Sequence, residues 1–305
     1  MKEQKNVDVV ILGGGPAGMT AAIYAARANL SAVLLEESVT GGLVNSTYTV
    51  ENFPSYTTIH GMELMQKMRE HVDSLDVEVE EVCDIESVSL EGDVKVVETD
   101  EVVYNAKAVI LSTGRKPIPL DVPTECDQVH HCAICDGGPY KGKRVLVVGG
   151  GNSAFDESLY MLGIGIEHIT LVEKMDRFFA AQSTQDSLLG TGKVDARKST
   201  IVHDLVVEGD TLKAAVLENV ETGERETVAV DGVFVFLGQL PNNELFKDVV
   251  TLSKGGYVVA DQHMATNVPG VFSAGDINDK HYRQITTAMA DGTIAALAAE
   301  RYIRS

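Results

Sequence analysis

The chain has 305 residues, 44% of them hydrophobic, and its 45 acidic against 25 basic side chains give a formal net charge of −20. This length and apolar content predict a folded protein with room for two domains and exclude an intrinsically disordered chain. The negative charge argues against nucleic acid and anionic membranes as partners, and no apolar run approaches the roughly 20 residues of a membrane span.

The first residues and the cysteines indicate a cellular compartment. Residues 1–6 are short and polar, unlike a secretory signal, and the four cysteines form no regular framework. We therefore expect a reducing compartment, by default the cytoplasm, where a close cysteine pair works as a redox couple rather than as a structural disulfide.

The first predicted elements form a βαβ unit. A β-branched strand, Val7–Leu12, leads through a glycine-rich turn into a helix expected over residues 19–28, and a second strand over 31–35 ends at Glu36. The turn carries three glycines at G-x-G-x-x-G spacing, Gly13, Gly15 and Gly18. Such glycines allow a tight turn, a close approach of pyrophosphate and close helix packing, and the acid can accept hydrogen bonds from a ribose 2′-hydroxyl. The pattern predicts a dinucleotide site.

A cysteine pair follows in the middle of the chain, where residues 132–136 read Cys-Ala-Ile-Cys-Asp. Two thiols one helical turn apart, beside a carboxylate, can store two electrons as a disulfide and handle the accompanying protons. Zinc sites share this spacing, and His130 and His131 are nearby, but no second CxxC or HxxxH follows at zinc spacing, so we expect no metal. Cys83 and Cys126 are expected to be bystanders.

The dinucleotide pattern then recurs. A strand over 144–148, a glycine-rich turn over 149–154, a helix through residue 162 and a strand over 169–172 that ends in Glu173 repeat the first unit. Ala154 replaces the third glycine, which is tolerated because that position needs only a small residue. Two sites in one chain suggest a flavin and a nicotinamide nucleotide.

A third signal lies near the end of the chain. Gly270–Asp276 reads as a short apolar strand whose turn presents an acid, and a helix is expected over residues 283–302. By itself this segment is equally typical of an ordinary turn at a strand end. Combined with the N-terminal unit, it reads as the far half of one flavin domain.

We therefore predict an α/β protein with two Rossmann-like dinucleotide-binding domains, the second inserted into the first. The flavin domain would comprise residues 1–116 and 246–305, and the nucleotide domain with the cysteine pair residues 117–245. Proline-containing segments near residues 115–119 and 240–246 have the rigid, turn-prone composition of linkers.

The chain resembles the low-molecular-weight thioredoxin reductases over essentially its whole length. Seven ordered segments match motifs of that family, namely Gly13–Gly18, Glu51–Pro54, Ser112–Gly114, Cys132–Gly137, Gly149–Ala154, Gly270–Asp276 and Tyr282–Gln284. The cysteine pair precedes the second glycine-rich turn, and no cysteine lies near Gly41 and Gly42, where glutathione-reductase-type enzymes carry theirs.

The resemblance implies the residues of two cofactor sites. The FAD site would include Gly13, Gly15, Pro16, Ala17, Gly18, Glu36, Gly42, Asn52, Gly114, Gly275, Asp276, Arg283 and Gln284. The nicotinamide-nucleotide site would include Gly149, Gly151, Asn152, Ser153, Ala154, Glu173 and Lys174.

The resemblance also implies a reaction and its catalytic residues. Electrons would pass from the donor through the flavin to a Cys132–Cys135 disulfide and then to thioredoxin. Cys135 would be the thiol next to the flavin, Cys132 the thiol that attacks the partner, and Asp136 the proton donor and acceptor. The nucleotide domain would rotate on the two linkers, and the enzyme would be a homodimer.

The sequence departs from the family at the nucleotide specificity segment. NADPH-dependent members carry HRRxxxR there, because arginines bind the 2′-phosphate by paired hydrogen bonds. This chain has Glu173 in place of the histidine, while Met175 and Phe179 replace two arginines. A carboxylate repels a phosphate but suits a free 2′-hydroxyl, so NADH is favoured over NADPH, although Lys174 and Arg177 leave a partial cationic site.

A second departure is Leu43, which stands where the family has a flavin-contacting glutamine. We do not transfer that role to the leucine.

The leading hypothesis is an FAD-dependent thioredoxin-disulfide reductase that uses NADH. The altered segment keeps open a reductase whose donor is ferredoxin. A flavin dithiol oxidase that passes electrons to oxygen and a non-catalytic flavin redox sensor are further alternatives. The sequence identifies neither the particular thioredoxin nor the dimer interface.

Overall fold

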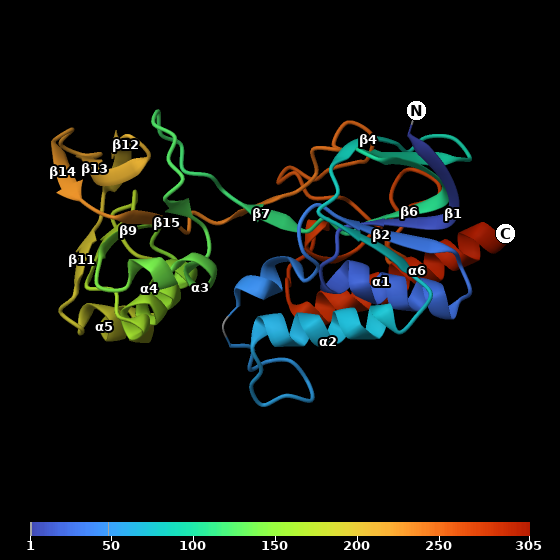
Figure 1. Cartoon of the computed structure of the whole chain (residues 1–305), viewed down its shortest axis with the longest axis horizontal. Coiled ribbons are helices and arrows are strands. Elements are labelled where there is room, and N and C mark those ends of the chain that lie inside the picture. The colour runs from blue at the N-terminus through green and yellow to red at the C-terminus, as the bar shows by residue number, and fades with distance from the viewer. Residues whose placement is uncertain (1, 48) are drawn as a thin grey trace. The chain divides into compact units, whose positions relative to one another are not determined.

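The computed structural model describes residues 2–47 and 49–305, which divide into two units. The first comprises Met1–Lys116 and Leu240–Ser305, and the second comprises Pro117–Gln239 (Figure 1). The second unit is thus inserted into the first, as expected.

The first unit is built on a seven-stranded sheet with the order β3-β2-β1-β6-β5-β4, to which β17 is added through β6. Its strands are β1 (Glu3–Leu12), β2 (Ala32–Glu36), β3 (Glu78–Glu81), β4 (Ile85–Ser89), β5 (Lys95–Thr99), β6 (Val102–Leu111) and β17 (Val271–Ser273). β3, β2, β1, β6 and β17 pair in parallel, whereas β5 and β4 are added antiparallel. The parallel part is the Rossmann-like core.

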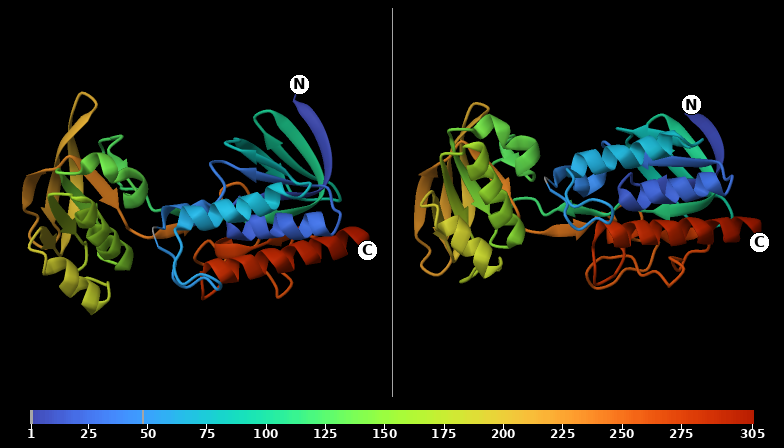
Figure 2. Two further views of the ribbon diagram at one scale, coloured as in Figure 1. Left: turned by 60° about the horizontal axis from the view of Figure 1, so that its bottom comes forward. Right: turned by 90° about the horizontal axis from the view of Figure 1, so that it is seen from below.

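Three helices pack side by side on one face of this sheet, as both views of Figure 2 show. They are α1 (Pro16–Arg27), α2 (Gly61–Asp73) and α6 (Ile285–Arg304). Short 3₁₀ helices, η1 (Gly42–Ser46) and η3 (Gly275–Ile277), lie at the turns after β2 and β17. The last long helix thus packs against the first, which joins the two ends of the chain in one unit.

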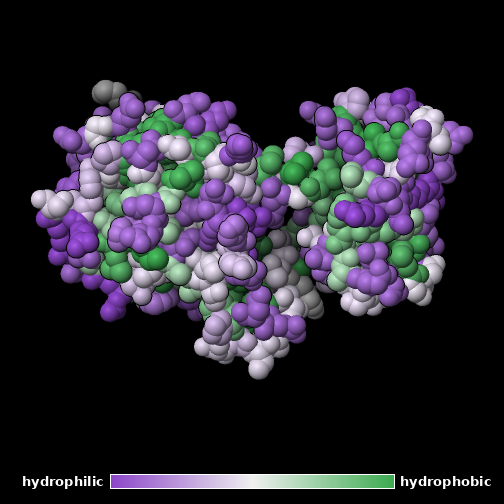
Figure 3. All heavy atoms as spheres, turned by 180° about the vertical axis from the view of Figure 1, so that it is seen from behind, coloured by the Kyte–Doolittle hydropathy of each residue, from purple (hydrophilic) through white to green (hydrophobic). Residues whose placement is uncertain are grey.

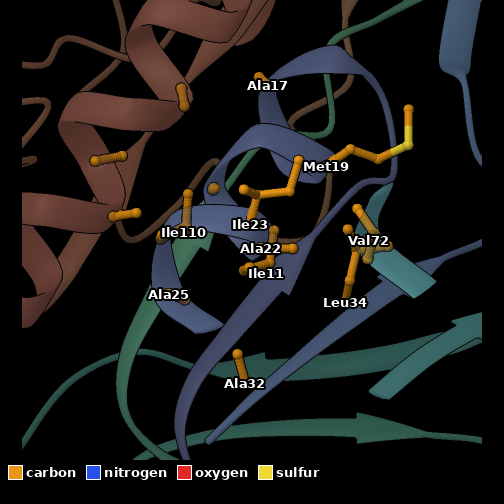
Figure 4. Close-up of a cluster of buried hydrophobic side chains, with 14 of the residues drawn as sticks. Ile11, Ala17, Met19, Ala22, Ile23, Ala25, Ala32, Leu34, Val72 and Ile110 are labelled. Carbon is orange, nitrogen blue, oxygen red and sulfur yellow. The ribbon is translucent and has the colours of Figure 1, made fainter. Parts of the chain in front are cut away.

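Side chains of β1 alternate between two cores because successive residues of a strand point to opposite faces. Ile11 packs with α1 and α2 residues such as Met19 and Val72, and Figure 4 shows this cluster around the first helix. Leu12 faces the opposite core, which includes Phe246. Burial on both faces explains the unbroken apolar run, residues 9–12, with which this strand ends.

The second unit contains a five-stranded parallel sheet with the order β11-β10-β9-β15-β8. Its strands are β8 (Val129–His130), β9 (Arg144–Val148), β10 (His168–Val172), β11 (Val194–Arg197) and β15 (Gly232–Val235). Its helices are α3 (Ala133–Asp136), η2 (Gly138–Tyr140), α4 (Asn152–Ile164) and α5 (Gln182–Leu189). A three-stranded antiparallel sheet of β12 (Thr200–Glu208), β13 (Thr211–Asn219) and β14 (Arg225–Ala229) completes the unit.

The two chain crossings pair with each other, because β7 (Arg115–Pro117) and β16 (Gln239–Pro241) form a two-stranded sheet. The return crossing lies between Gln239 and Leu240, at the start of the expected linker near residues 240–246, whereas the predicted domain boundary lies between residues 245 and 246. The reason is packing: Phe246 is 1% exposed in the core of the first unit, and Leu245 packs against that core. Asn242 is tied to the same unit, since its N–H donates to Gly114 O at 3.1 Å.

Several element ends also differ from the predictions. β1 starts at Glu3 rather than Val7, because the polar residues before Val7 still pair with β6. α1 starts at Pro16 rather than Met19, since proline is favoured in the first helical turn, where its missing N–H leaves no hydrogen bond unmade. These differences lengthen elements without changing their order.

On the face drawn in Figure 3, hydrophobic residues lie in small groups among hydrophilic ones in both units. No helix within the described residues is long and apolar enough to cross a membrane.

Candidate active site

The first glycine-rich turn separates glycines that the fold requires from one that it does not. Gly13 has φ of +100°, and a Cβ there would lie 2.4 Å from Ser112 O, so the turn itself needs glycine. A Cβ on Gly18 would lie 1.8 Å from Gly13 O, which explains the third glycine by packing. A Cβ on Gly15, in contrast, would have no atom of the described residues within 4 Å. Gly15 therefore leaves open the space where a phosphate would approach.

The start of α1 lies beside this open space and suits an anion there. Gly15 is its N-cap, Pro16 occupies the first turn, and neither a capping side chain nor a first-turn acid is present among the described residues. The first N–H groups of a helix lack partners within the helix and attract anions. The turn therefore fits the pyrophosphate of FAD. Ala17 is buried behind it, where its Cβ would lie 2.8 Å from a Cβ on Gly275.

Glu36 stands at the carboxyl end of β2 beside this turn. Its Oε2 accepts a hydrogen bond from Gly14 N at 2.7 Å, and its Oε1 accepts one from Ser38 N at 2.9 Å. A carboxylate oxygen can accept a second hydrogen bond. Glu36 is therefore fixed by the backbone with acceptor capacity left for a ribose hydroxyl.

Gly42 and Gly114 were also expected in the flavin site. A Cβ on Gly42 would lie 3.3 Å from Gly15 Cα, which places the start of η1 against the first glycine-rich turn. A Cβ on Gly114 would meet no described atom within 4 Å. Leu43, the departure from the family pattern, is half-buried within η1.

The far half of the unit presents Asp276 in η3. Its Oδ2 forms an ion pair with Arg115 Nη2 at 3.1 Å. Asp276 Oδ1 and Arg115 Nε are buried, and neither has a hydrogen-bond partner in the described part of the chain. Buried polar atoms without partners are rare and often mark ligand positions. This pair therefore fits hydroxyl groups of a flavin side chain.

Gly275 and Arg283 help to hold the turn around this acid. Gly275 N donates to Asp291 Oδ2 at 3.1 Å, and the same oxygen pairs with Lys280 Nζ at 2.6 Å. The Arg283 guanidinium lies 4.1 Å from the centre of the Tyr257 ring. These contacts make the turn a preorganised element.

Two further predicted residues meet although they are far apart in sequence. Asn52 Nδ2 donates to Gln284 Oε1 at 3.1 Å across a separation of 232 residues. Gln284 is the N-cap of α6 and forms a capping box with Thr287. The contact places the segment after η1 at the start of the last helix.

The second unit repeats the geometry of the first glycine-rich turn. Gly149 has φ of +126°, and a Cβ there would lie 2.4 Å from Phe236 O. Gly151, like Gly15, would place a Cβ with no described atom within 4 Å, and α4 begins after it without a capping side chain in the described chain. This turn therefore fits the pyrophosphate of a nicotinamide nucleotide.

The other predicted residues of this turn have different surroundings. Ala154 is fully buried in the core and Ser153 is exposed at the start of α4. Asn152 Oδ1 accepts a hydrogen bond from Ala181 N at 2.9 Å, so its side chain serves the fold.

Glu173 occupies in the second unit the place that Glu36 has in the first. Its Oε1 accepts from Met175 N at 2.8 Å, and a Cβ on Gly150 would lie 2.6 Å from its Oε2. The carboxylate therefore lies against the glycine-rich turn. Lys174 is exposed, and Arg177 lies 5.1 Å from the centre of the Phe179 ring.

The cysteine pair lies at the start of α3, with Cys132 as N-cap. Cys132 and Cys135 form a disulfide with a Cα–Cα distance of 5.4 Å. Cys132 Sγ also accepts a hydrogen bond from Cys135 N at 3.1 Å. Asp136 follows at the end of the helix, with its side chain 40% exposed, so both sulfurs and a carboxylate belong to one short helix. The described residues contain no group of three or more His, Cys, Asp and Glu side chains that could hold a metal ion.

The sequence interpretation missed Arg115 and Glu157. Nothing local links Arg115 to an acid 161 positions away. Glu157 lies on α4 at helical spacing from buried Ala154 and Met161, which is a signal, since an acid on an apolar helix face is unusual. Burial raises the pKa of Glu157 to about 7, against the opposing effect of the Ala133 N–H. A buried acid therefore lies beneath the redox helix.

Comparisons with known proteins agree with this arrangement. A family model described as pyridine nucleotide-disulphide oxidoreductase matches residues 7–292. The thioredoxin reductase of Bacillus subtilis (strain 168) is 38% identical, with 99% of this chain and 96% of that protein covered. A Clostridium pasteurianum protein described as a 34.2 kDa protein in the rubredoxin operon is 43% identical, with 99% of each chain covered.

Among solved structures, Lactococcus lactis thioredoxin reductase superposes with a TM-score of 0.87 at 36% identity, covering 98% of this chain and 99% of that one. The predicted family and fold class are therefore confirmed. The chain belongs to the pyridine nucleotide-disulphide oxidoreductases, within the low-molecular-weight thioredoxin reductase family, and is a flavin-dependent disulfide oxidoreductase.

Proposed function

We propose that this protein is an NADH-dependent thioredoxin-disulfide reductase with FAD as its resident cofactor. In the overall reaction NADH and a proton reduce the disulfide of a thioredoxin to a dithiol, and NAD⁺ is released. FAD supplies the chemistry that converts the two-electron donation of the nucleotide into reduction of a disulfide. Relatives at 36–38% identity over nearly the whole chain are thioredoxin reductases, which supports thioredoxin as the partner.

The observation that carries the proposal is the Cys132–Cys135 disulfide at the start of α3 with Asp136 at its end. Once this disulfide is reduced, the Cys132 thiolate attacks the disulfide of the partner, and the released sulfur takes up a proton. Cys135 then attacks Cys132 in the mixed disulfide, which restores the intramolecular bond and frees the second partner thiol. Asp136 is the group that gives and takes protons during these exchanges.

The preference for NADH rests on Glu173. Its carboxylate is held against Gly150 as Glu36 is held against Gly14, so both acids face the turn that would bind a dinucleotide. A carboxylate in that place accepts a hydrogen bond from a free 2′-hydroxyl and repels a 2′-phosphate. Of the two cations in this segment, Arg177 lies over the Phe179 ring and Lys174 is exposed.

An anaerobic titration of the purified flavoprotein with NADH and, separately, NADPH tests the donor. We expect NADH to bleach the oxidised flavin band at a far lower concentration than NADPH. Preferential bleaching by NADPH would contradict the interpretation of Glu173. Multiple turnover of thioredoxin disulfide with the active donor tests the partner and excludes an inert redox sensor.

A second candidate donor is a small iron–sulfur protein such as a ferredoxin. Two observations favour it: the altered segment 173–179, and a relative of 43% identity that is described as a protein of a rubredoxin operon. Reduction of the flavin by ferredoxin, with no bleaching by either nucleotide, would establish this donor. Release of peroxide after addition of a reduced dithiol would instead identify a dithiol oxidase.

A further inference from the structure

A histidine and a tyrosine form a chain of polar contacts that ends at the proton-transferring carboxylate. His130, in β8, has its Nε2 at 2.7 Å from the Tyr140 hydroxyl and its Nδ1 at 3.5 Å from Asp136 Oδ2. His130, Asp136 and Tyr140 come from β8, the redox helix α3 and η2, which follow one another along the chain. None of this is visible as a sequence motif.

The position of the proton in each of these two contacts follows from the chemistry of the partners. An ionised carboxylate only accepts, so the proton of a neutral His130 must lie on Nδ1 when it faces Asp136. Nε2 is then an acceptor, and the Tyr140 hydroxyl must donate to it. Tyr140 thus fixes the tautomer of His130, and His130 directs an N–H toward Asp136.

The protonation states agree with this direction. Burial lowers the pKa of His130, against the opposing effect of Asp136, so the imidazole is neutral near neutral pH. Burial raises the pKa of Tyr140, so its hydroxyl keeps the proton that it donates.

Packing holds both rings in place. The His130 ring lies 5.4 Å from the Tyr140 ring and 5.2 Å from the Phe234 ring, measured between centres, and the latter two rings meet edge-on at 5.5 Å. A Cβ on Gly232 would lie 2.4 Å from the Tyr140 ring, so the tyrosine fills the space over β15. The pair is therefore a rigid support for the partly exposed carboxylate.

Other ionisable groups of the described residues also lie near Tyr140, His130 and Asp136. His131 adjoins His130 and opposes its protonation. Around Tyr140, the acidic groups Cys126 and Asp231 act in the same sense as Asp136, and Lys143 Nζ lies 5.3 Å from the ring centre. Among the described residues, Asp136 is the carboxylate that lies against the imidazole nitrogen.

We propose that His130 and Tyr140 are positioning residues for Asp136, which hold its carboxylate by the Nδ1–H of a tautomerically fixed, neutral imidazole. An N–H that points toward a carboxylate favours its charged form. Removing this N–H is therefore expected to move the part of the pH profile that Asp136 governs to higher pH. This inference deepens the proposed function, because it adds residues to the proton transfer of the same site.

The test isolates the disulfide exchange from the electron donor. The flavoprotein is reduced photochemically without oxygen, then mixed with thioredoxin disulfide or, separately, with 5,5′-dithiobis(2-nitrobenzoate), and flavin reoxidation is followed across pH. The limb of the profile that Asp136→Asn removes is the limb that Asp136 governs. If thioredoxin fails and the small disulfide reacts, the proposed partner is wrong, but the proton-transfer inference is still tested.

The variants separate positioning from packing. His130→Gln keeps a polar atom near Tyr140 but loses the donor toward Asp136, and we expect the limb to move up by about half to one pH unit. His130→Asn places an amide N–H near the position of Nδ1 and should restore most of the wild-type profile. Tyr140→Phe keeps the ring but removes the hydroxyl that fixes the tautomer of His130. It should therefore give a smaller shift of the limb in the same direction.

A matched control is available in the same unit. His203 Nδ1 lies 3.4 Å from Glu218 Oε2, a similar pair that is remote in sequence from the redox helix. His203→Gln should leave the profile unchanged. A His130→Gln profile that coincides with wild type, or a shift that persists in the Asp136→Asn background, overturns the inference. So does an Asp136→Asn profile that keeps every limb of the wild type.

Discussion

Arg115 and Asp276 are 161 positions apart and form an ion pair of 3.1 Å, in which each side chain keeps one buried polar atom without a hydrogen-bond partner among the described residues. Burying such atoms costs free energy unless a partner compensates. FAD hydroxyl groups would supply that partner, so the pair links the stability of the first unit to its cofactor.

Replacing Asp276→Asn should weaken flavin binding by about tenfold, because one charge-assisted hydrogen bond contributes on the order of 1.5 kcal/mol. Flavin fluorescence titration of the apoprotein measures this change. Glu63→Gln, which removes an exposed ion pair with Lys67 in the same unit, is the control and should bind flavin normally. Unchanged affinity in Asp276→Asn would remove this acid from the flavin site.

Gly15→Ala and Gly151→Ala should each lose one cofactor and keep the fold. Both glycines have negative φ, −73° and −88°, and an added Cβ meets no described atom within 4 Å. The methyl group would instead occupy the space of the pyrophosphate. We expect Gly15→Ala to be purified largely without flavin, whereas Gly151→Ala keeps flavin and shows a raised KM for the nucleotide.

Circular dichroism of the two variants checks that neither substitution disturbs the fold. Each variant is the control of the other, since the two turns are equivalent in geometry. Retention of flavin by Gly15→Ala with normal affinity would contradict the assignment of the first turn.

Cys132→Ser and Cys135→Ser should both bind flavin and both lose multiple turnover of disulfides, because a single thiol cannot complete the intramolecular exchange. Only the Cys132 thiol is expected to form a stable mixed disulfide with thioredoxin, in the Cys135→Ser protein. Mass spectrometry of the trapped complex checks this assignment. A trapped complex through Cys135 would reverse the two roles. Retained turnover in either variant would contradict the assignment of Cys132 and Cys135 as the redox-active pair.

Glu173→Arg should shift the donor preference toward NADPH. The change removes a carboxylate that repels the 2′-phosphate and adds a guanidinium that binds it, which we expect to change the ratio of kcat/KM values by about tenfold or more. Steady-state rates with both nucleotides measure the ratio. Glu167→Arg, at an exposed position before β10, makes the same charge change away from the turn and should leave the ratio unaltered.

Glu157 should make the stability of the protein depend on pH. Burial raises the pKa of Glu157 to about 7 in the folded chain, above its ordinary 4.5. Its contribution to stability is therefore fully present below about pH 4.5 and is lost as the pH rises through about 7. Glu157→Gln cannot ionise at this position. Its free energy of unfolding, relative to that of the wild type, should therefore rise by about 2 kcal/mol between about pH 5 and pH 8.

Urea unfolding at the two pH values measures this gain. Glu167→Gln, an exposed glutamate to glutamine change, serves as the control and should show no pH-dependent difference. An equal effect of Glu157→Gln at both pH values would contradict the raised pKa.

Most of the fold could be predicted because its signals are local. Apolar strands that end in G-x-G-x-x-G or its alanine variant, followed by a helix and an acid at the end of the next strand, identify both dinucleotide units. The backbone needs glycine at Gly13 and Gly149 whatever surrounds them, and the disulfide lies between cysteines only three positions apart. The sequence by itself therefore determined the fold class, the family and the redox helix.

Only the tertiary structure decided which distant side chains meet. Arg115 with Asp276 and Asn52 with Gln284 are brought together by strand order and helix packing, which no local pattern encodes. The return crossing at residue 240 was decided by the burial of Phe246, since a single aromatic residue gains more from a formed core than from a linker. The chain thus encodes its turns and its thiols locally, while the environment of its charges depends on the packed fold.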